Sequence, residues 1–382
     1  MPDQAVGRLL RFFAVAAYLA LLCAQAVAQA PAGVSVSAPA GYGLQPENVA
    51  MVINDDDANS VAVGEYYRLA RQIPERNVVH VRIPNRPHRL DRTAFAQLKQ
   101  DIEARLHPGI EAIVMLWTAP YAVECNSITS AMTLGFDAGQ CEKTCAPGKP
   151  SRYFDSASVR PFQDFGMRLA MLLPTDSVEQ ARALIDRGVI SSFKVHPASA
   201  YFLQTSDPHR NTRARFFPPS GIFPQKELVV RTLRADSLEG AQDVMFYLTG
   251  LTGVPKLETL HFMPGALADH LTSTGGDLLG KGQMSSLRWL EAGATASYGT
   301  VSEPCNHWQK FPQPAVLLKH YLSGATAIEA YWKSVAWPAQ GVFIGEPLAA
   351  PYSPASRRPA RGTGRSHWSG AADGSAPAPV PR

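Results

Sequence analysis

The sequence lacks the short motifs that would assign it to a common enzyme class. It contains no G-x-G-x-x-G, no Walker loop, no H-E-x-x-H, no C-x-x-C pair and no G-x-S-x-G elbow. These absences count against dinucleotide enzymes, phosphate-loop ATPases, zincins and α/β-hydrolases of the usual type. No internal repeat is visible either.

The chain also lacks a basic surface of the kind that binds nucleic acid. Its formal net charge is +4 over 382 residues. The segment from Ser353 to Arg382 holds five Arg and one Asp, which together equal that whole charge. No basic stripe with interleaved aromatic residues occurs elsewhere. We therefore expect no nucleic-acid partner.

A comfortable membrane span is missing as well. The apolar run from Phe12 to Leu22 falls short of the about 20 residues that a bilayer requires. Arg8 and Arg11 precede this run, and the small residues Ala26-Val27-Ala28 follow it, which is the pattern of a cleavable signal. We predict a signal peptide over 1–28, a flexible leader over 29–47, and a periplasmic or secreted protein with no stable membrane span after cleavage.

Residues 48–352 alternate short apolar runs with amphipathic ones, which indicates a single α/β domain with a mostly parallel sheet. The segment 119–161 breaks this rhythm with three cysteines and four prolines, and is predicted to be a functional or cross-linked insertion. Residues 353–382 are poor in aliphatic side chains and are predicted to form a disordered tail. The expected strands are 49–53, 77–83, 110–117, 167–173, 201–205, 228–233, 244–248, 294–301 and 342–345, and the expected helices 59–71, 93–106, 177–187, 283–291, 315–322 and 326–335.

Four cysteines remain once Cys23 leaves with the signal: Cys125, Cys141, Cys145 and Cys305. An even number in an oxidising compartment predicts disulfides, in any of three connectivities. A zinc site is the alternative, with Cys305 or His307 completing the three cysteines of the insertion. Export favours the disulfides.

Carboxylates follow the first expected strand, in Asn54-Asp55-Asp56-Asp57. Ligands of open α/β sheets gather at such strand ends, so Asp55 and Asp57 are candidates to bind a ligand or a Ca²⁺ or Mg²⁺ ion. The simpler interpretation is that they complement the positive end of the next helix. The spacing resembles the start of an EF-hand loop, but Tyr66 stands where that loop needs its closing Glu.

The segment beginning at Asp269 gathers more polar groups than an ordinary core needs. On a strand, Asp269 and His270 would face opposite sides, which counts against a Ser-His-Asp relay with Ser273. The two glycines that follow permit positive φ or a close approach of backbones. We predict a cleft near His270 that binds a peptide or a glycan. Its candidate binding residues are Asp269, Thr272, Ser273, Gly275 and Gly276.

Cys305 follows the expected strand 294–301 at its carboxyl end, a usual place for a nucleophile. A thiolate needs a nearby base or cation, which His270 or His307 would supply, and Glu303 would orient the imidazole. Alternatively, Cys305 is oxidised and His270 is a structural residue. The catalytic hypothesis requires the loops around 270 and 305 to converge at one rim of the sheet.

Several sequence blocks resemble those of an uncharacterised family of exported bacterial proteins with no assigned activity. The blocks are Asn59-Ser60, Tyr66-Tyr67, Arg71-Gln72-Ile73-Pro74-Glu75-Arg76-Asn77, Asp269-His270-Leu271-Thr272-Ser273, Gly293-Ala294-Thr295-Ala296, Gly299-Thr300-Val301-Ser302-Glu303-Pro304 and Gly345-Glu346-Pro347-Leu348. The resemblance covers most of the segment from Asn48 to Pro351. The Gly-Thr-Val-x-Glu-Pro block is its most specific part.

More distantly, the arrangement is similar to gingipain-type cysteine peptidases of the caspase-like fold. The similarity implies a caspase-like three-layer α/β sandwich. It also implies that the peptidase His would fall near 247–250 and the peptidase Cys near 269–273. The first segment contains no histidine and the second no cysteine, and Cys305 comes one strand too late. The resemblance therefore supports the fold and counts against the peptidase dyad.

Three functional interpretations follow from the sequence. The first is an exported protein on a peptidase-like scaffold that binds a peptide or glycan near His270. The second is a thiol hydrolase or divergent cysteine peptidase that uses Cys305 with His270 or His307. The third is a structural factor of the cell envelope. No cofactor is expected in any of them.

Overall fold

The computed structural model describes residues 43–191 and 197–354, and these belong to one compact unit. The predicted signal peptide and nearly all of the predicted tail lie outside the described residues. Leu44, placed by the sequence in a flexible leader, is buried against the domain, and its amide donates to Glu329 Oε2 over 3.1 Å. In the part of the predicted leader that the structure describes, Leu44 is therefore packed against the domain.

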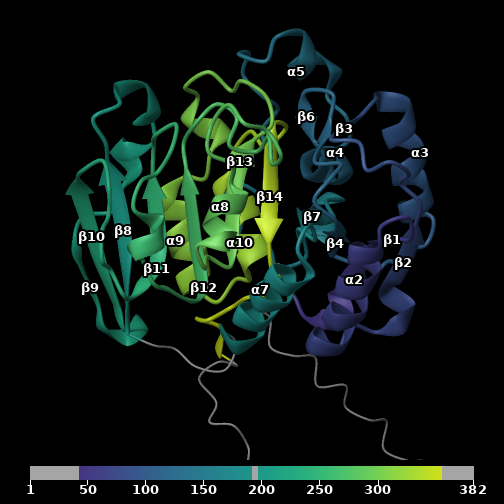
Figure 1. Cartoon of the computed structure of the whole chain (residues 1–382), viewed down its shortest axis with the longest axis horizontal. Helices are drawn as coiled ribbons and strands as arrows, with labels where there is room; N and C mark the ends of the chain where they lie inside the picture. The colour runs from purple at the N-terminus through teal and green to yellow at the C-terminus, as the bar shows by residue number, and fades with distance from the viewer. Residues whose placement is uncertain (1–42, 192–196, 355–382) are drawn as a thin grey trace, which may run out of the picture. The chain divides into compact units, whose positions relative to one another are not determined.

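An eleven-stranded sheet dominates the fold, with strands in the order β2-β1-β4-β7-β14-β13-β12-β11-β8-β10-β9, and β3, β5 and β6 form a second, small sheet (Figure 1). The strands are β1 (Val49–Asn54), β2 (Val78–Val81), β3 (Arg89–Leu90), β4 (Ala112–Leu116), β5 (Ala122–Val123), β6 (Asn126–Ser127), β7 (Leu169–Leu172), β8 (Ala198–Gln204), β9 (Gly221–Phe223), β10 (Leu228–Arg234), β11 (Val244–Thr249), β12 (Phe262–His270), β13 (Ala296–Thr300) and β14 (Gly341–Gly345).

The large sheet is mostly parallel, which confirms the predicted fold class. Strands β2, β1, β4 and β7 pair in parallel, and so do β13, β12, β11, β8 and β10. β14 runs antiparallel to β13, and β9 runs antiparallel to β10. Every residue of β1, β4, β7, β11, β13 and β14 is buried, as expected of strands covered on both faces.

Helices cover both faces of this sheet. They are α2 (Ala58–Arg71), α3 (Arg92–Glu103), α4 (Ile128–Leu134), α5 (Ala138–Glu142), α6 (Pro161–Phe165), α7 (Val178–Ser191), α8 (Leu287–Glu291), α9 (Pro314–Leu322) and α10 (Ala327–Ser334). In Figure 1, α2, α7 and α8 lie in front of the sheet, and α9 and α10 lie behind it. Within the described residues, no helix is long and apolar enough to cross a bilayer.

The cysteine-bearing segment 119–161 contains more regular structure than the sequence predicts. It contributes β5 and β6, which form the small sheet with β3, and the helix α4. All but the last residue of α4 are buried, and the Thr133 hydroxyl accepts a hydrogen bond from Ala170 N of β7 over 3.0 Å. This segment therefore builds part of the core. Its short elements of two to seven residues are too brief to leave a clear periodicity in the sequence.

Candidate pocket at the ends of β8, β12 and β13

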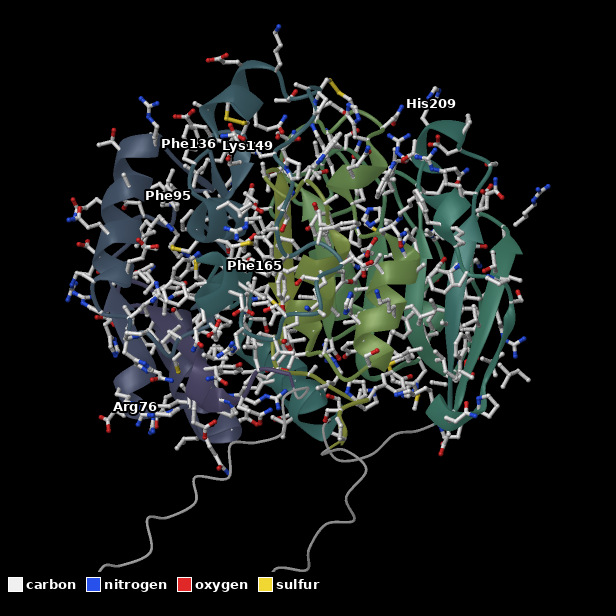
Figure 2. The ribbon with its side chains drawn as sticks, turned by 180° about the vertical axis from the view of Figure 1, so that it is seen from behind. Arg76, Phe95, Phe136, Lys149, Phe165 and His209 are labelled. Carbon is white, nitrogen blue, oxygen red and sulfur yellow. A yellow bond between two sulfur atoms is a disulfide. The ribbon has the colours of Figure 1, made fainter. Side chains whose placement is uncertain are left out.

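Three loops meet at the carboxyl ends of β8, β12 and β13 and enclose a pocket of about 230 Å³. It is lined by His209, Arg210, Leu271, Thr272, Ser273, Glu303, Pro304, Asn306 and Phe311. His209 marks this upper edge of the molecule in Figure 2. Ligands of parallel α/β sheets bind at this edge. The loops around 270 and 305 thus converge as the sequence analysis required, and Thr272, Ser273 and Glu303 line the pocket together.

Arg210 forms one wall of the pocket and is held in place on two sides. Its Nη1 donates to Asp207 Oδ2 over 2.6 Å, and its Nε donates to Thr272 Oγ1 over 3.2 Å. The Thr272 hydroxyl in turn donates to Gln283 Oε1 over 2.7 Å. Arg210 Nη2 donates to no residue in the described part of the chain. A cationic donor is therefore fixed at the pocket with hydrogen-bonding capacity to spare.

Glu303 contributes an anionic group to the same pocket. Its side chain is exposed, and Oε1 accepts from the backbone amide of Cys305 over 2.8 Å. Oε2 accepts no hydrogen bond from the described residues. The sequence assigned Glu303 to orient a histidine ring, but here it bonds the backbone of its own loop. The pocket thus combines one cation and one anion with the buried apolar side chains Leu271, Pro304 and Phe311.

Cys305 is bonded to Cys145, and Cys125 is bonded to Cys141. The predicted disulfides are therefore present, and one of the three possible connectivities is realised. A sulfur in a disulfide is neither a thiol nor a thiolate, and it cannot act as the proposed nucleophile. The catalytic interpretation of Cys305 is corrected on this ground. His307, the other candidate base, instead bonds the backbone oxygen of Cys145 through Nε2 over 2.9 Å.

His270 is buried behind the pocket and does not line it. Its Nδ1 accepts a hydrogen bond from the indole Nε1 of Trp289 over 2.9 Å, and only 1% of the residue is exposed. Burial, reinforced by the positive charge of Arg213, lowers the pKa of His270 to about 3. A neutral imidazole that accepts from an indole in the core is a structural residue. The structure thus corrects the role of His270 as a catalytic base.

The buried imidazole has a measurable effect on stability. An unfolded chain protonates His270 near pH 6.5, whereas the folded chain resists protonation down to about pH 3. The contribution of neutral His270 to the free energy of unfolding is therefore fully present above pH 6.5 and is lost as the pH falls. We expect a loss of about 1.4 kcal/mol per pH unit in this window. His270→Asn, which keeps an acceptor for Trp289, should lack this component in urea unfolding. If the wild type and His270→Asn lose the same free energy of unfolding between pH 7 and pH 4, the prediction is contradicted.

Asp269 faces the opposite side of β12 from His270, as the strand periodicity predicted. It forms an ion pair of 2.5 Å with Arg213, and both side chains are at most 1% exposed. Arg213 also donates to the backbone oxygens of Thr249 and Pro312. Because Arg213 follows Arg210 by three residues, this pair anchors the turn that carries the pocket wall. Asp269 thus supports the pocket from below and does not line it.

Gly276 allows a close approach of backbones, which was one of the two expectations for the pair Gly275-Gly276. A Cβ on Gly276 would lie 2.5 Å from the carbonyl oxygen of Gly299 in β13. The amide of Gly276 donates to Thr300 O over 2.9 Å, so the loop after β12 lies directly on the end of β13. Neither Gly275 nor Gly276 lines the pocket.

The carboxylates after β1 lie away from this pocket and bond to nearby groups. Asp57 caps α2, since its Oδ1 accepts from Asn59 N over 3.0 Å, and Oδ2 lies 3.3 Å from Arg86 Nη1. Asp55 contacts His80 Nδ1 at 2.7 Å. These contacts favour the helix-end interpretation over a ligand site. In residues 43–191 and 197–354, no three His, Cys, Asp or Glu side chains group as metal ligands do.

The positions implied by the peptidase resemblance fall at the ends of β11 and β12. Gly250 follows β11, and a Cβ there would overlap the backbone oxygen of Arg210. The turn after β8 thus packs directly against Gly250. Sequence reasoning missed six residues that line the pocket: His209, Arg210, Leu271, Pro304, Asn306 and Phe311. The turn signal Ser206-Asp207-Pro208 after the expected strand 201–205 could have pointed to the first two.

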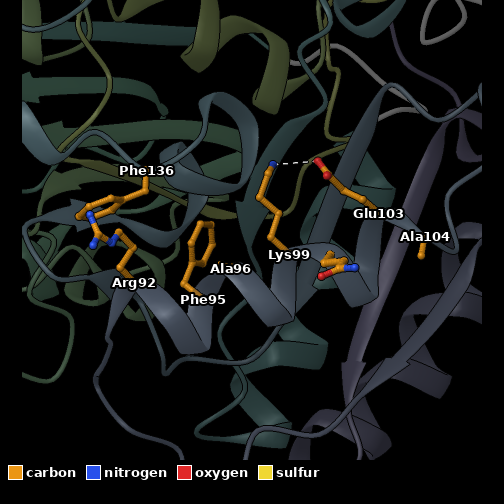
Figure 3. Close-up of a pocket in the computed structure, with 8 residues that line it drawn as sticks. Arg92, Phe95, Ala96, Lys99, Glu103, Ala104 and Phe136 are labelled. Carbon is orange, nitrogen blue, oxygen red and sulfur yellow. Dashed lines mark ion pairs between the residues drawn. The ribbon is translucent and has the colours of Figure 1, made fainter.

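A second hollow of about 450 Å³ lies along the exposed face of α3 (Figure 3). Phe95 and Phe136 form its apolar part, and Arg92 lies over the Phe136 ring at 6.0 Å. Lys99 and Glu103 pair with each other at 2.8 Å on the same helix. Lys99 and Glu103 thus satisfy each other, whereas Glu303 in the pocket at β12 forms no ion pair with another described residue.

Comparison with known proteins identifies no family for this chain. No family model matches the chain, and no curated protein matches it. A solved structure described as "Structure of Protease" is similar to it with a TM-score of 0.42 and 9% sequence identity, over 82% of this chain and 80% of that one. A likeness this weak carries no argument about activity. The sequence resemblances to the exported family and to gingipain-type peptidases stay predictions.

Proposed function

We propose that the chain is an exported protein that binds peptides carrying an acidic side chain in the pocket at β8, β12 and β13. The observation that supports this is that one cation and one anion at the pocket each keep a free hydrogen-bonding atom, although Arg210 also pairs with Asp207 through Nη1. Arg210 Nη2 is free to donate and Glu303 Oε2 is free to accept, as far as the described residues are concerned. Export is supported by the predicted signal segment and by two disulfides, which persist in oxidising compartments.

The size of the pocket favours a peptide over a larger ligand. About 230 Å³ lies below the usual range for drug-sized ligands, roughly 300–1,000 Å³, but it suits one side chain. A carboxylate entering it would meet Arg210 in a charge-assisted hydrogen bond. A peptide amide or ammonium beside it would donate to Glu303. A neutral glycan, the other predicted ligand class, would offer neither a carboxylate to Arg210 nor an ammonium group to Glu303.

Fluorescence anisotropy with labelled hexapeptides tests this proposal. The peptides are acetylated and amidated, and differ only in a central Asp, Glu, Asn or Lys. We expect the acidic peptides to bind and the Asn and Lys peptides to bind at least ten-fold more weakly. Arg210→Met should weaken the acidic peptide by about 10- to 100-fold, since a hydrogen bond to a charged group is worth about 1.5–3 kcal/mol.

Arg234→Met is the matched control, because Arg234 is exposed at the end of β10 and does not line the pocket. It should leave the affinity unchanged. Equal affinity for the Asp and Asn peptides, absence of binding by any peptide, or full affinity in Arg210→Met would each refute the proposal.

A further inference from the structure

The Cys145–Cys305 disulfide ties the pocket to the segment 119–161. It joins residues 160 positions apart in the sequence, and Cys305 sits between two pocket-lining residues, Pro304 and Asn306. The other bond, Cys125–Cys141, spans 16 residues inside that segment, and no pocket-lining residue is next to either of its cysteines in the sequence. The two disulfides therefore have different structural roles: one shapes the pocket, and the other staples the segment.

The pocket loop adopts a backbone conformation that needs support. Cys305 and Asn306 have φ values of 54° and 41°, both in the left-handed region. This region costs a non-glycine residue about 1–2 kcal/mol, and asparagine tolerates it better than cysteine. The covalent link to Cys145 helps hold Cys305 in this conformation. Because Glu303 bonds the Cys305 amide at 2.8 Å, the same link sets the position of the acidic group.

The two disulfides also differ in access. Cys145 is an exposed residue and Cys305 a partly exposed one, so we expect Cys145 to be the cysteine that a thiolate in solvent reaches first. Cys125 and Cys141 are both partly exposed, and the Asn126 amide nitrogen lies 3.2 Å from each sulfur. Exposed disulfides are the ones that exchange readily with thiols.

We infer that Cys145–Cys305 is a thiol-exchange site through which a reducing dithiol releases the pocket loop and lowers its affinity for ligand. The binding part of this inference rests on the proposed function, whereas the release of the loop does not. When the bond is intact, Glu303 and Asn306 line the pocket together with Arg210. When it is reduced, Cys305 leaves the left-handed conformation, and the residues on either side of it move with the backbone.

The exchange is a two-electron step. One thiolate of the dithiol attacks the Cys145 sulfur, the bond between Cys145 and Cys305 breaks, and its electron pair leaves with the Cys305 sulfur, which takes up a proton. The second thiolate then attacks the mixed disulfide and releases Cys145, which is also protonated. The dithiol is oxidised to its own disulfide and gives up two protons in total. The two protein thiols take up the same number.

In the first test, the native full chain is treated with rising concentrations of dithiothreitol. The free thiols are then alkylated and identified by mass spectrometry. We expect Cys145 and Cys305 to be labelled at a dithiothreitol concentration at least ten-fold lower than the one needed to label Cys125 and Cys141. Labelling in the reverse order, or of all four together, would overturn the inference.

The second test measures amide hydrogen exchange over residues 302–308. Cys145→Ser/Cys305→Ser should exchange there at least ten-fold faster than the wild type, and the control Cys125→Ser/Cys141→Ser should not. Wild type reduced after folding gives the same readout if the serine variant fails to fold. Unchanged protection in reduced wild type would sink the inference.

The third measurement separates this inference from the proposed function. If the oxidised chain binds the acidic peptide and the reduced chain binds at least ten-fold more weakly, both stand. If loop release is seen but the oxidised chain binds no peptide, the proposed function fails and the exchange site remains. Equal peptide affinity in both redox states would overturn the link between the disulfide and binding.

Discussion

Replacing Arg213 by methionine is expected to destabilise the folded chain by about 3–5 kcal/mol, because it leaves the carboxylate of Asp269 buried without its counter-charge. Burial already raises the pKa of Asp269, although the charge of Arg213 works in the opposite direction. Without Arg213, the carboxylate must either stay charged in the core or take up a proton. Both alternatives cost free energy, and the backbone oxygens of Thr249 and Pro312 lose a donor as well.

Urea unfolding of the single and double variants measures this loss. Arg213→Met/Asp269→Leu removes both charges and should be more stable than Arg213→Met, since apolar residues often replace a buried ion pair at little cost. Arg215→Met is the matched control. Arg215 is exposed and stacks on Phe216 at 4.8 Å, a contact worth about 0.5–1 kcal/mol. Equal losses in Arg213→Met and Arg215→Met would show that the buried pair is not a structural anchor.

Gly276→Ala is expected to cost about 3 kcal/mol, the upper end of what overpacking usually costs. The added Cβ would lie 2.5 Å from the carbonyl oxygen of Gly299 and 2.7 Å from its carbon. Both contacts are with backbone, and the hydrogen bond from the Gly276 amide to Thr300 holds the two segments together. The loop that carries Thr272 and Ser273 can therefore relieve the clash only by moving away from β13.

Gly282→Ala is the control for this substitution, because a Cβ at Gly282 would meet nothing within 4 Å. It should change the free energy of unfolding by less than about 1 kcal/mol, and replacing a glycine in an unstrained loop can even stabilise the fold. Thermal or urea unfolding of the two variants decides the matter. If Gly276→Ala is as stable as Gly282→Ala, the close approach of the two backbones is not required by the fold.

Most strands and helices could be predicted from the sequence because their signals are local. The expected strand 49–53 is observed as Val49–Asn54, and the expected helix 93–106 as Arg92–Glu103, capped by Asp91. The strand β12 was missed, although it carries Asp269 and His270. Pro264 and Gly265 interrupt its pattern, and Gly265 has a φ of 88°, which breaks the regularity that the prediction relies on.

The candidate site was predictable only in part. Period-two alternation was enough to place Asp269 and His270 on opposite faces of a strand. Thr272, Ser273 and Glu303 were assigned to one site on the assumption that the loops around 270 and 305 converge at one rim of the sheet, and these three residues do line one pocket. His209 and Arg210 were missed because they follow β8, which lies two strands away from β12 with β11 between them. The order of strands in the sheet brings this turn to the pocket, and local patterns do not encode that order.

The sequence by itself determined the α/β class and the positions of most elements. Each of these depends on residues within one or two turns or strands of one another. The tertiary structure decided that Cys305 pairs with Cys145, that Arg213 neutralises Asp269, and that His270 faces Trp289 in the core. These partners are 160, 56 and 19 residues apart. Whether a polar side chain is reactive or structural depends on such distant neighbours, because burial and counter-charge exist only once the sheet has assembled.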